Sequence, residues 1–149
     1  MKGRSLVWPL VLLLAVALLG QTARWRARST AGRILHQVEA LTMAAVNAGR
    51  APSYLLVSNL EALRRAAELD PLEIGIPIAR GSQHFLLRNA RAAIDSYEDA
   101  LALEPRPEIY FNLGRAHDLA GNAEEARRNY QLGLRLSPRL ASEVPAQYQ

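Results

Sequence analysis

The stretch Glu108–Pro138, EIYFNLGRAHDLAGNAEEARRNYQLGLRLSP, decides the fold of this 149-residue chain. Its centre holds the pair Gly121–Asn122, two residue types that tolerate the left-handed backbone conformation in which helices end and turn. Small residues such as Gly114 and Ala126 stand where a buried face is expected, and helices approach to about 8–10 Å only where one side offers such residues. The stretch therefore predicts two antiparallel helices in close contact.

The same pattern occurs a second time, 33 residues upstream. Segment 76–105 aligns with segment 109–138 without a gap, and nine of the identical pairs define the pattern. These nine pairs are Gly81 and Gly114, His84 and His117, Asn89 and Asn122, Ala90 and Ala123, Ala93 and Ala126, Tyr97 and Tyr130, Leu101 and Leu134, Leu103 and Leu136, and Pro105 and Pro138. The earlier segment 60–71, LEALRRAAELDP, aligns at its C-terminal end. A hairpin of this size cannot bury its own apolar faces, so the copies are expected to stack.

This pattern resembles the tetratricopeptide repeat, a helix–turn–helix unit of about 34 residues. In the last copy the places typical of the family are held by Tyr110, Leu113, Gly114, Ala126, Tyr130 and Pro138. In the middle copy they are held by Gly81, Ala93, Tyr97 and Pro105. The last copy departs at His117 and Gly133, where the family has an aromatic residue and alanine, and the middle copy departs at Pro77 and Arg80.

The resemblance implies an all-α fold, a short solenoid of about three helical hairpins. We expect this domain over residues 31–138, followed by a C-terminal tail, 139–149. Its parts are a degenerate repeat at 31–71, whose first helix covers about 31–48, a repeat at 74–106 and the best-preserved repeat at 107–138.

An uncharged apolar segment precedes this domain. Residues 5–23 would form about 28 Å of helix, close to the ~30 Å hydrocarbon core of a bilayer, and Trp25 then falls where interfacial aromatic residues lie. We expect a basic N-terminus (1–4), a transmembrane signal-anchor helix (5–23) and a basic juxtamembrane linker (24–30). A cleaved signal peptide and a buried soluble helix are the alternatives.

The positive charge is concentrated around this segment. Residues 1–50 carry Lys2 and six arginines against Glu39, a net +6, whereas residues 51–149 carry eleven arginines against thirteen acids, a net −2. This distribution favours a membrane surface over nucleic acid as the partner. The short charged N-terminus and the arginine-rich composition favour a bacterial inner-membrane protein with its C-terminal domain outside the cytoplasm, although the flanking charges leave the orientation open.

The sequence offers little for catalysis. It has no cysteine, which excludes disulfides, thiol nucleophiles and thiolate metal sites. The adjacent acids in Glu98–Asp99 and Glu124–Glu125 point about 100° apart on a helix, so they form solvated faces rather than acid–base pairs. His84 and His117 hold one repeat position, which favours packing over a two-histidine metal site. We expect no enzyme, no cofactor and no bound metal.

The remaining candidate is a binding surface. In the family, the first helices of successive repeats line a concave groove, and the register carries this role to Ile78, Ser82, Phe85, Phe111, Asn112, Arg115 and Asp118. The alternative for Phe85 and Phe111 is a place in the core. A second candidate is the C-terminal end: Pro145 disfavours a capping helix, so Leu132 and Leu136 are expected to stay uncovered and to contact a partner or a second copy.

Together these features predict a membrane-anchored module of scaffold or adaptor type that binds a protein or peptide partner without catalysis. The alternative is a structural subunit that self-associates, or docks into an envelope complex, through an uncapped last repeat. Phe111→Ala and Arg115→Glu are expected to abolish partner capture if the groove is the binding site.

Overall fold

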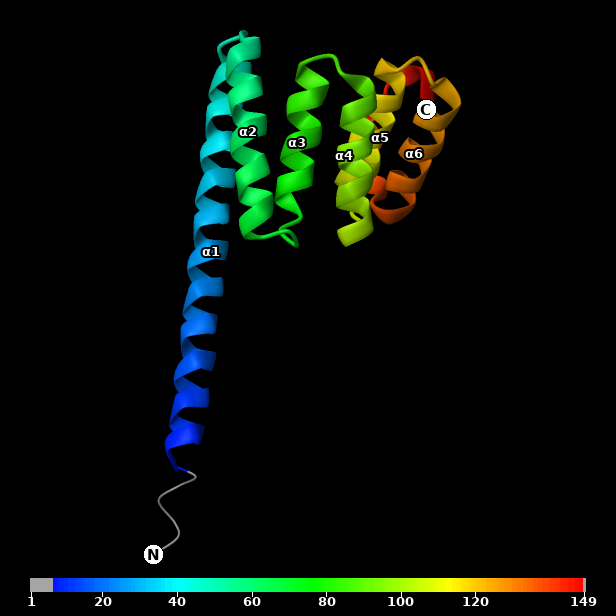
Figure 1. Cartoon of the computed structure of the whole chain (residues 1–149). Helices are drawn as coiled ribbons and strands as arrows, with labels where there is room; N and C mark the ends of the chain where they lie inside the picture. Colours follow the sequence, from blue (N-terminus) through cyan, green and yellow to red (C-terminus); the bar gives the residue numbers. More distant parts are fainter. Residues whose placement is uncertain (1–6, 149) are drawn as a thin grey trace, which may run out of the picture.

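The computed structural model describes residues 7–148, which form helices and connecting turns without a strand. The α-helices are α1 (Val7–Asn47), α2 (Ser53–Leu69), α3 (Gly75–Leu86), α4 (Ala90–Leu103), α5 (Pro107–Leu119) and α6 (Ala123–Leu136). Two 3₁₀ segments follow, η1 (Pro138–Glu143) and η2 (Ala146–Tyr148). The helices from α2 onward stand side by side in an antiparallel row, and α1 runs beyond this row toward the N-terminus (Figure 1).

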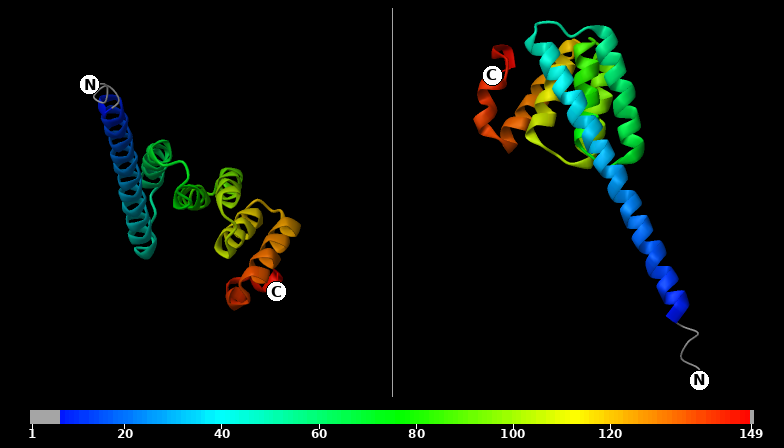
Figure 2. Two further views of the ribbon diagram at one scale, coloured as in Figure 1. Left: turned by 90° about the horizontal axis from the view of Figure 1, so that it is seen from below. Right: turned by 90° about the vertical axis from the view of Figure 1, so that its left-hand side faces the viewer.

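The row consists of three stacked hairpins. The C-terminal part of α1 pairs with α2, α3 pairs with α4, and α5 pairs with α6. Neighbouring hairpins meet through α2 against α3 and α4 against α5, so the chain progresses in one direction along the array (Figure 2). This arrangement confirms the all-α solenoid expected from the repeated pattern. The helix expected at 31–48 is only the C-terminal part of the 41-residue α1.

The paired small and aromatic residues contact each other as the pattern predicts. A Cβ atom at Gly81 would lie 2.4 Å from Cε1 of Tyr97, and one at Gly114 would lie 2.8 Å from Cε1 of Tyr130. Such distances are too short for any real side chain, so each glycine is the place where one helix accepts the ring of its partner. The two hairpins are therefore built by the same contact.

The turns between first and second helices also repeat. Gly121 has a φ of +79°, and the following amide N–H of Asn122 donates to the carbonyl of His117 at 2.9 Å. The equivalent residue of the middle hairpin is Arg88, with a φ of +61°. Glycine adopts this left-handed conformation readily, whereas a residue with a Cβ does so at a cost. The turn predicted at Gly121–Asn122 is confirmed, and the middle hairpin makes it with a less suitable residue.

The C-terminal end of the array is covered, so the expectation of an uncapped last repeat is wrong. Residues 138–148 fold back against α6, and Val144 and Tyr148 are 3% and 9% exposed in a cluster with Phe111 and Tyr130. The Tyr148 hydroxyl donates to Oδ1 of Asp118 at 2.5 Å. Pro145 does limit helix formation, but short 3₁₀ turns bring apolar side chains onto this end without a long helix.

The tail leaves the leucines at this end of α6 buried to different degrees. Leu134 packs against the cluster around Tyr130, Leu132 is half-buried, and Leu136 is 55% exposed. This end therefore exposes less apolar surface than the sequence indicates. What stays exposed is Leu136, at the last turn of α6.

Helix α1 is continuous through the segment expected to be a linker. Residues 24–30 lie inside α1, and no proline or glycine occurs between Gln21 and Ala31, so nothing in this segment favours a kink. Residues 8–19 are all exposed, with Trp8 at 76% and Leu19 at 69%. This half of α1 projects from the domain (Figure 1), and by length and composition helix α1 could cross a membrane.

Candidate protein-binding groove

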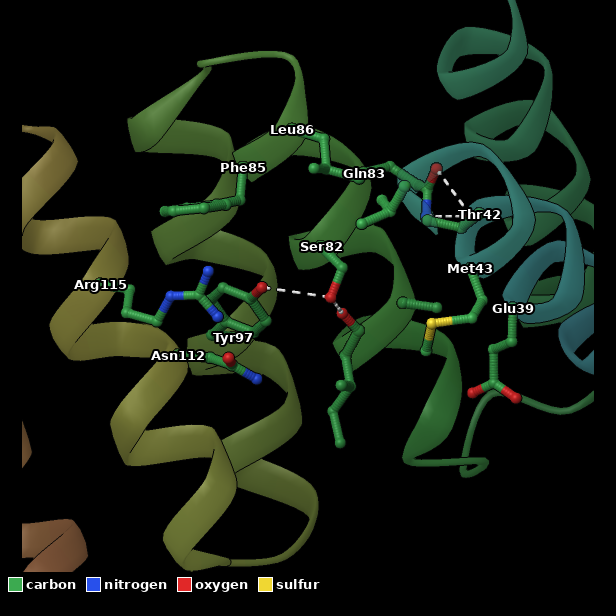
Figure 3. Close-up of a pocket in the computed structure, with 13 residues that line it drawn as sticks. Glu39, Thr42, Met43, Ser82, Gln83, Phe85, Leu86, Tyr97, Asn112 and Arg115 are labelled. Carbon is green, nitrogen blue, oxygen red and sulfur yellow. Dashed lines mark hydrogen bonds between the residues drawn. The ribbon is translucent and has the colours of Figure 1, made fainter. Parts of the chain in front are cut away.

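The inner face of the array contains a groove formed mainly by the first helices of the three hairpins. Its volume is about 540 Å³. Its lining residues from α1 are Glu39, Thr42, Met43 and Val46; those from α3 are Ile78, Ala79, Ser82, Gln83, Phe85 and Leu86; Tyr97 comes from α4, and Asn112 and Arg115 come from α5. The lining is mostly apolar, with a carboxylate and a guanidinium on opposite sides (Figure 3).

Most of the residues expected in a groove lie in this one. Ile78, Ser82 and Phe85 from α3 and Asn112 and Arg115 from α5 all line it. They converge because positions i, i+4 and i+7 of a helix share one face, and the stacking of the hairpins aligns the faces of α3 and α5. The register of the repeat therefore places residues from two separate copies around one space.

Phe111 was expected to line the groove, but it lies in the core instead. Its side chain is 4% exposed and packs between α5 and α6, where a Cβ at Gly133 would lie 2.6 Å from the phenyl ring. The family has alanine at the position of Gly133, and the missing methyl group gives the ring of Phe111 its space. Phe111 also meets Tyr130 edge-on, with ring centroids 5.8 Å apart.

Asp118 lies at the edge of the groove rather than in it. It lines a second, smaller hollow with Phe85, Arg88 and Pro145. Its carboxylate accepts the hydrogen bond from Tyr148, so the tail takes part of its hydrogen-bonding capacity.

The groove residues contributed by α1 were missed by the sequence analysis. Glu39, Met43 and Val46 have the same i, i+4, i+7 spacing as Ile78, Ser82 and Phe85, but the two sets are 39 residues apart instead of 33. The first hairpin has a longer α2 and longer connections on both sides of it than the equivalent parts of the second hairpin, and these produce the difference. A search for the spacing alone, without a fixed period, would have found them.

A buried polar cluster joins the first hairpin to the second beside the groove. The Nδ2 of Asn59 donates to Oγ1 of Thr42 at 3.1 Å and to Oε1 of Gln83 at 3.2 Å, and Nε2 of Gln83 donates to Oγ1 of Thr42 at 3.1 Å. Asn59 and Gln83 are 3% and 1% exposed. Because each buried polar group has partners, the cluster fixes the relative position of α1, α2 and α3.

The other side of the groove is held by an aromatic and cationic arrangement. The guanidinium carbon of Arg115 lies 4.8 Å from the ring centroid of Phe85, within the range of a cation–π contact. Beside them, the hydroxyls of Ser82 and Tyr97 lie 3.3 Å apart and share a hydrogen bond (Figure 3). Arg115 forms no ion pair with any residue from 7 to 148, so its charge is available to a ligand.

The two equivalent tyrosines differ at their hydroxyls. Burial raises the pKa of Tyr97, and the hydrogen bond between Tyr97 and Ser82 partly opposes this. Burial, and next the negative charge of Asp118, raise the pKa of Tyr130 to about 12, and its buried Oη has no hydrogen-bond partner among the described residues. Folding therefore removes the hydroxyl of Tyr130 from water without giving it a new hydrogen bond.

We expect Tyr130→Phe to leave the free energy of unfolding at pH 7 within about 0.5 kcal/mol of the parent, and Tyr97→Phe to lower it by about 1 kcal/mol. Above pH 10 the unfolded chain releases the Tyr130 proton that the folded chain keeps up to about pH 12. Stability therefore falls as pH rises through this window, and Tyr130→Phe should make the fall shallower. Urea unfolding at pH 7 and pH 11 measures both effects; an equally steep fall in the variant would contradict the assignment.

The two histidines occupy equivalent, half-buried positions on α3 and α5. Burial lowers the pKa of His84 below its usual value, and the charge of Arg80 lowers it further. The Nδ1 atoms of His84 and His117 are buried without hydrogen-bond partners in the described part of the chain. Within residues 7–148, no group of three or more His, Asp or Glu side chains is placed to hold a metal ion.

The fold and groove define the class of protein: a helical-repeat solenoid whose first helices line most of a groove. Residues 107–140 match the family profile of the tetratricopeptide repeat. The hairpin α5–α6 is thus a tetratricopeptide repeat, and the array that it closes has a TPR-like solenoid fold. Tetratricopeptide repeats generally mediate contacts between proteins.

Solved structures carry the same fold across most of the chain. A thermophilic TPR protein of Thermus thermophilus is similar with a TM-score of 0.70 and 25% identity, covering 91% of this chain and 73% of that one. The structure described as MamA MSR-1 C2 is similar with a TM-score of 0.57 and 21% identity, covering 72% of this chain and 59% of that one. No curated protein matched the chain.

Proposed function

We propose that this chain is a membrane-anchored module that holds a segment of a protein partner in its concave groove and acts by binding alone. The observation that carries the proposal is the groove itself, in which side chains from three hairpins converge on one space of about 540 Å³. A space of this size accommodates a short peptide segment rather than a whole domain.

The lining indicates the chemistry of the partner segment. Met43, Val46 and Leu86 offer apolar contacts, and Met43 is 62% exposed. Arg115, stacked on Phe85, offers a cation without a competing ion pair among the described residues. Buried aromatic and arginine side chains are the usual anchors of protein interfaces. We expect the segment to combine apolar side chains with a carboxylate that reaches Arg115.

The proposed anchor is the exposed N-terminal half of α1. Its apolar side chains lie on all sides of the helix, which is the distribution found in lipid rather than in water. Tethering would raise the effective concentration of the module near partners at the same membrane. A bacterial inner membrane, with the groove outside the cytoplasm, fits the charge distribution described above.

The test is capture of the partner by crosslinking in native membranes, followed by measurement of its affinity for the full-length chain. Arg115→Glu should weaken binding by about tenfold or more, because it replaces the exposed cation with a like charge for the partner carboxylate. Arg91→Glu is the matched control, since Arg91 is an exposed arginine of α4 outside the groove. Unchanged affinity of the Arg115 variant, with its helical content intact, would exclude the groove as the binding site.

A further inference from the structure

One end of the solenoid carries a row of exposed leucines. This is the end at which α2, α4 and α6 finish and α3 and α5 begin, and it faces the projecting half of α1 (Figure 1). The leucines are Leu69, Leu72, Leu103 and Leu136, which are 38%, 70%, 39% and 55% exposed. We refer to them as the leucine edge. Three of them close the second helices of the three hairpins, so the repeat itself brings them to the same level.

The height of this edge along α1 is fixed by contacts. Nε of Arg28 lies 3.8 Å from Oδ2 of Asp70, in the connection that also carries Leu72. One turn further along α1, Ala31 is fully buried against the first two hairpins. The leucine edge therefore lies near the level of residue 28. Because α1 is one continuous helix, the distance along its axis from the leucine edge to the apolar segment is fixed.

The distance from the edge to the apolar segment follows from the helix. The uncharged run ends at Ala23, and five residues of helix span about 7.5 Å. The polar headgroup layer on each side of a bilayer is about 5–8 Å thick. An anchor that ends at Ala23 would thus place the leucine edge at the outer part of the headgroup layer, with Trp25 between the two levels.

We propose that the leucine edge rests on the lipid surface, so that the solenoid lies against the membrane in which α1 is anchored. This proposal depends on the anchor of the proposed function. It commits to a lipid surface because the continuous helix leaves this edge next to the headgroups in either orientation. Acidic and basic side chains are mixed at this end, where Asp70, Glu73 and Glu104 lie among Arg28 and Arg106. Their charges largely cancel, so the contact with lipid is expected to come from the leucines.

The chain contains no cysteine, so single labelling sites can be introduced freely. The full-length chain would be labelled with an environment-sensitive fluorophore at Leu72→Cys or Leu136→Cys, and as a control at Ala120→Cys, an exposed site at the opposite end of the array. The variants would be placed in phosphatidylcholine vesicles that contain a lipid with a spin-labelled headgroup. We expect quenching at Leu72→Cys and Leu136→Cys to exceed that at Ala120→Cys by about threefold or more.

Two further measurements keep this proposal separate from that of the anchor. A label at Leu14→Cys should be protected from aqueous iodide; if it is not, the anchor itself is wrong. If Leu14→Cys is protected but the edge and the control are quenched equally, the anchor stands and the leucine edge is refuted. Because the contact is apolar, the quenching at Leu136→Cys should persist in high salt and fall when Leu72→Asp and Leu103→Asp are added; loss of quenching in salt alone would contradict an apolar contact.

Discussion

Phe111→Ala is expected to lower the free energy of unfolding by about 3–5 kcal/mol, the cost of removing a buried aromatic side chain. The phenyl ring fills the space left by Gly133 and meets Tyr130 edge-on, with Val144 and Tyr148 of the tail in the same cluster. Its loss would leave a cavity that joins α5, α6 and the tail. Because repeats contact only their neighbours, the last hairpin should unfold before the others.

The free energy can be measured by urea unfolding of the full-length chain in detergent micelles, with circular dichroism as the readout of helix content. Leu136→Ala is the matched control, because this leucine is 55% exposed and its truncation should change the free energy by no more than about 0.5 kcal/mol. A loss below about 1 kcal/mol at Phe111 would contradict its place in the core. Partner capture would also fall in Phe111→Ala, but through unfolding, so this variant cannot test the groove.

Gly81→Val is expected to destabilise the chain by an amount near the upper end of the roughly 1–3 kcal/mol typical of overpacked cores. An added Cβ alone would lie 2.4 to 2.7 Å from three atoms of the Tyr97 ring, which is 2% exposed and cannot move into solvent. The helices α3 and α4 would have to separate. That movement would also disturb the hydrogen bond between Tyr97 and Ser82 in the wall of the groove.

Gly32→Val separates this effect from the change in helix propensity. Gly32 lies in α1, and a Cβ there would meet nothing within 4 Å. Glycine and valine differ by only a few tenths of a kcal/mol inside a helix, so this control should be close to neutral. Thermal unfolding of both variants gives the comparison. Equal stability of the two would show that the close approach at Gly81 is not required for the fold.

Much of the candidate site follows from the repeat register. Ile78, Ser82 and Phe85 recur at helical spacing, and the copy 33 residues later places Asn112 and Arg115 beside them. The contribution of α1 could not be found in this way, because α2 and the connections on both sides of it are longer than their equivalents in the next hairpin. The polar cluster of Thr42, Asn59 and Gln83 was also beyond the sequence, since three separate helices must meet before its members become neighbours.

The sequence by itself determined the elements and their order of stacking. These features are either local, such as helix periodicity and the turn at Gly121–Asn122, or recur at a fixed offset, such as the paired small and aromatic residues. They can be read from the sequence because they do not depend on contacts between distant segments. Only the tertiary structure decided which way Phe111 points, that the tail covers the last hairpin, and that α1 continues without a break into the domain. Each of these depends on volume or on contacts between distant segments: the space beside Gly133, the fit of Tyr148 against Asp118, and the packing of Ala31 that holds α1 to the array.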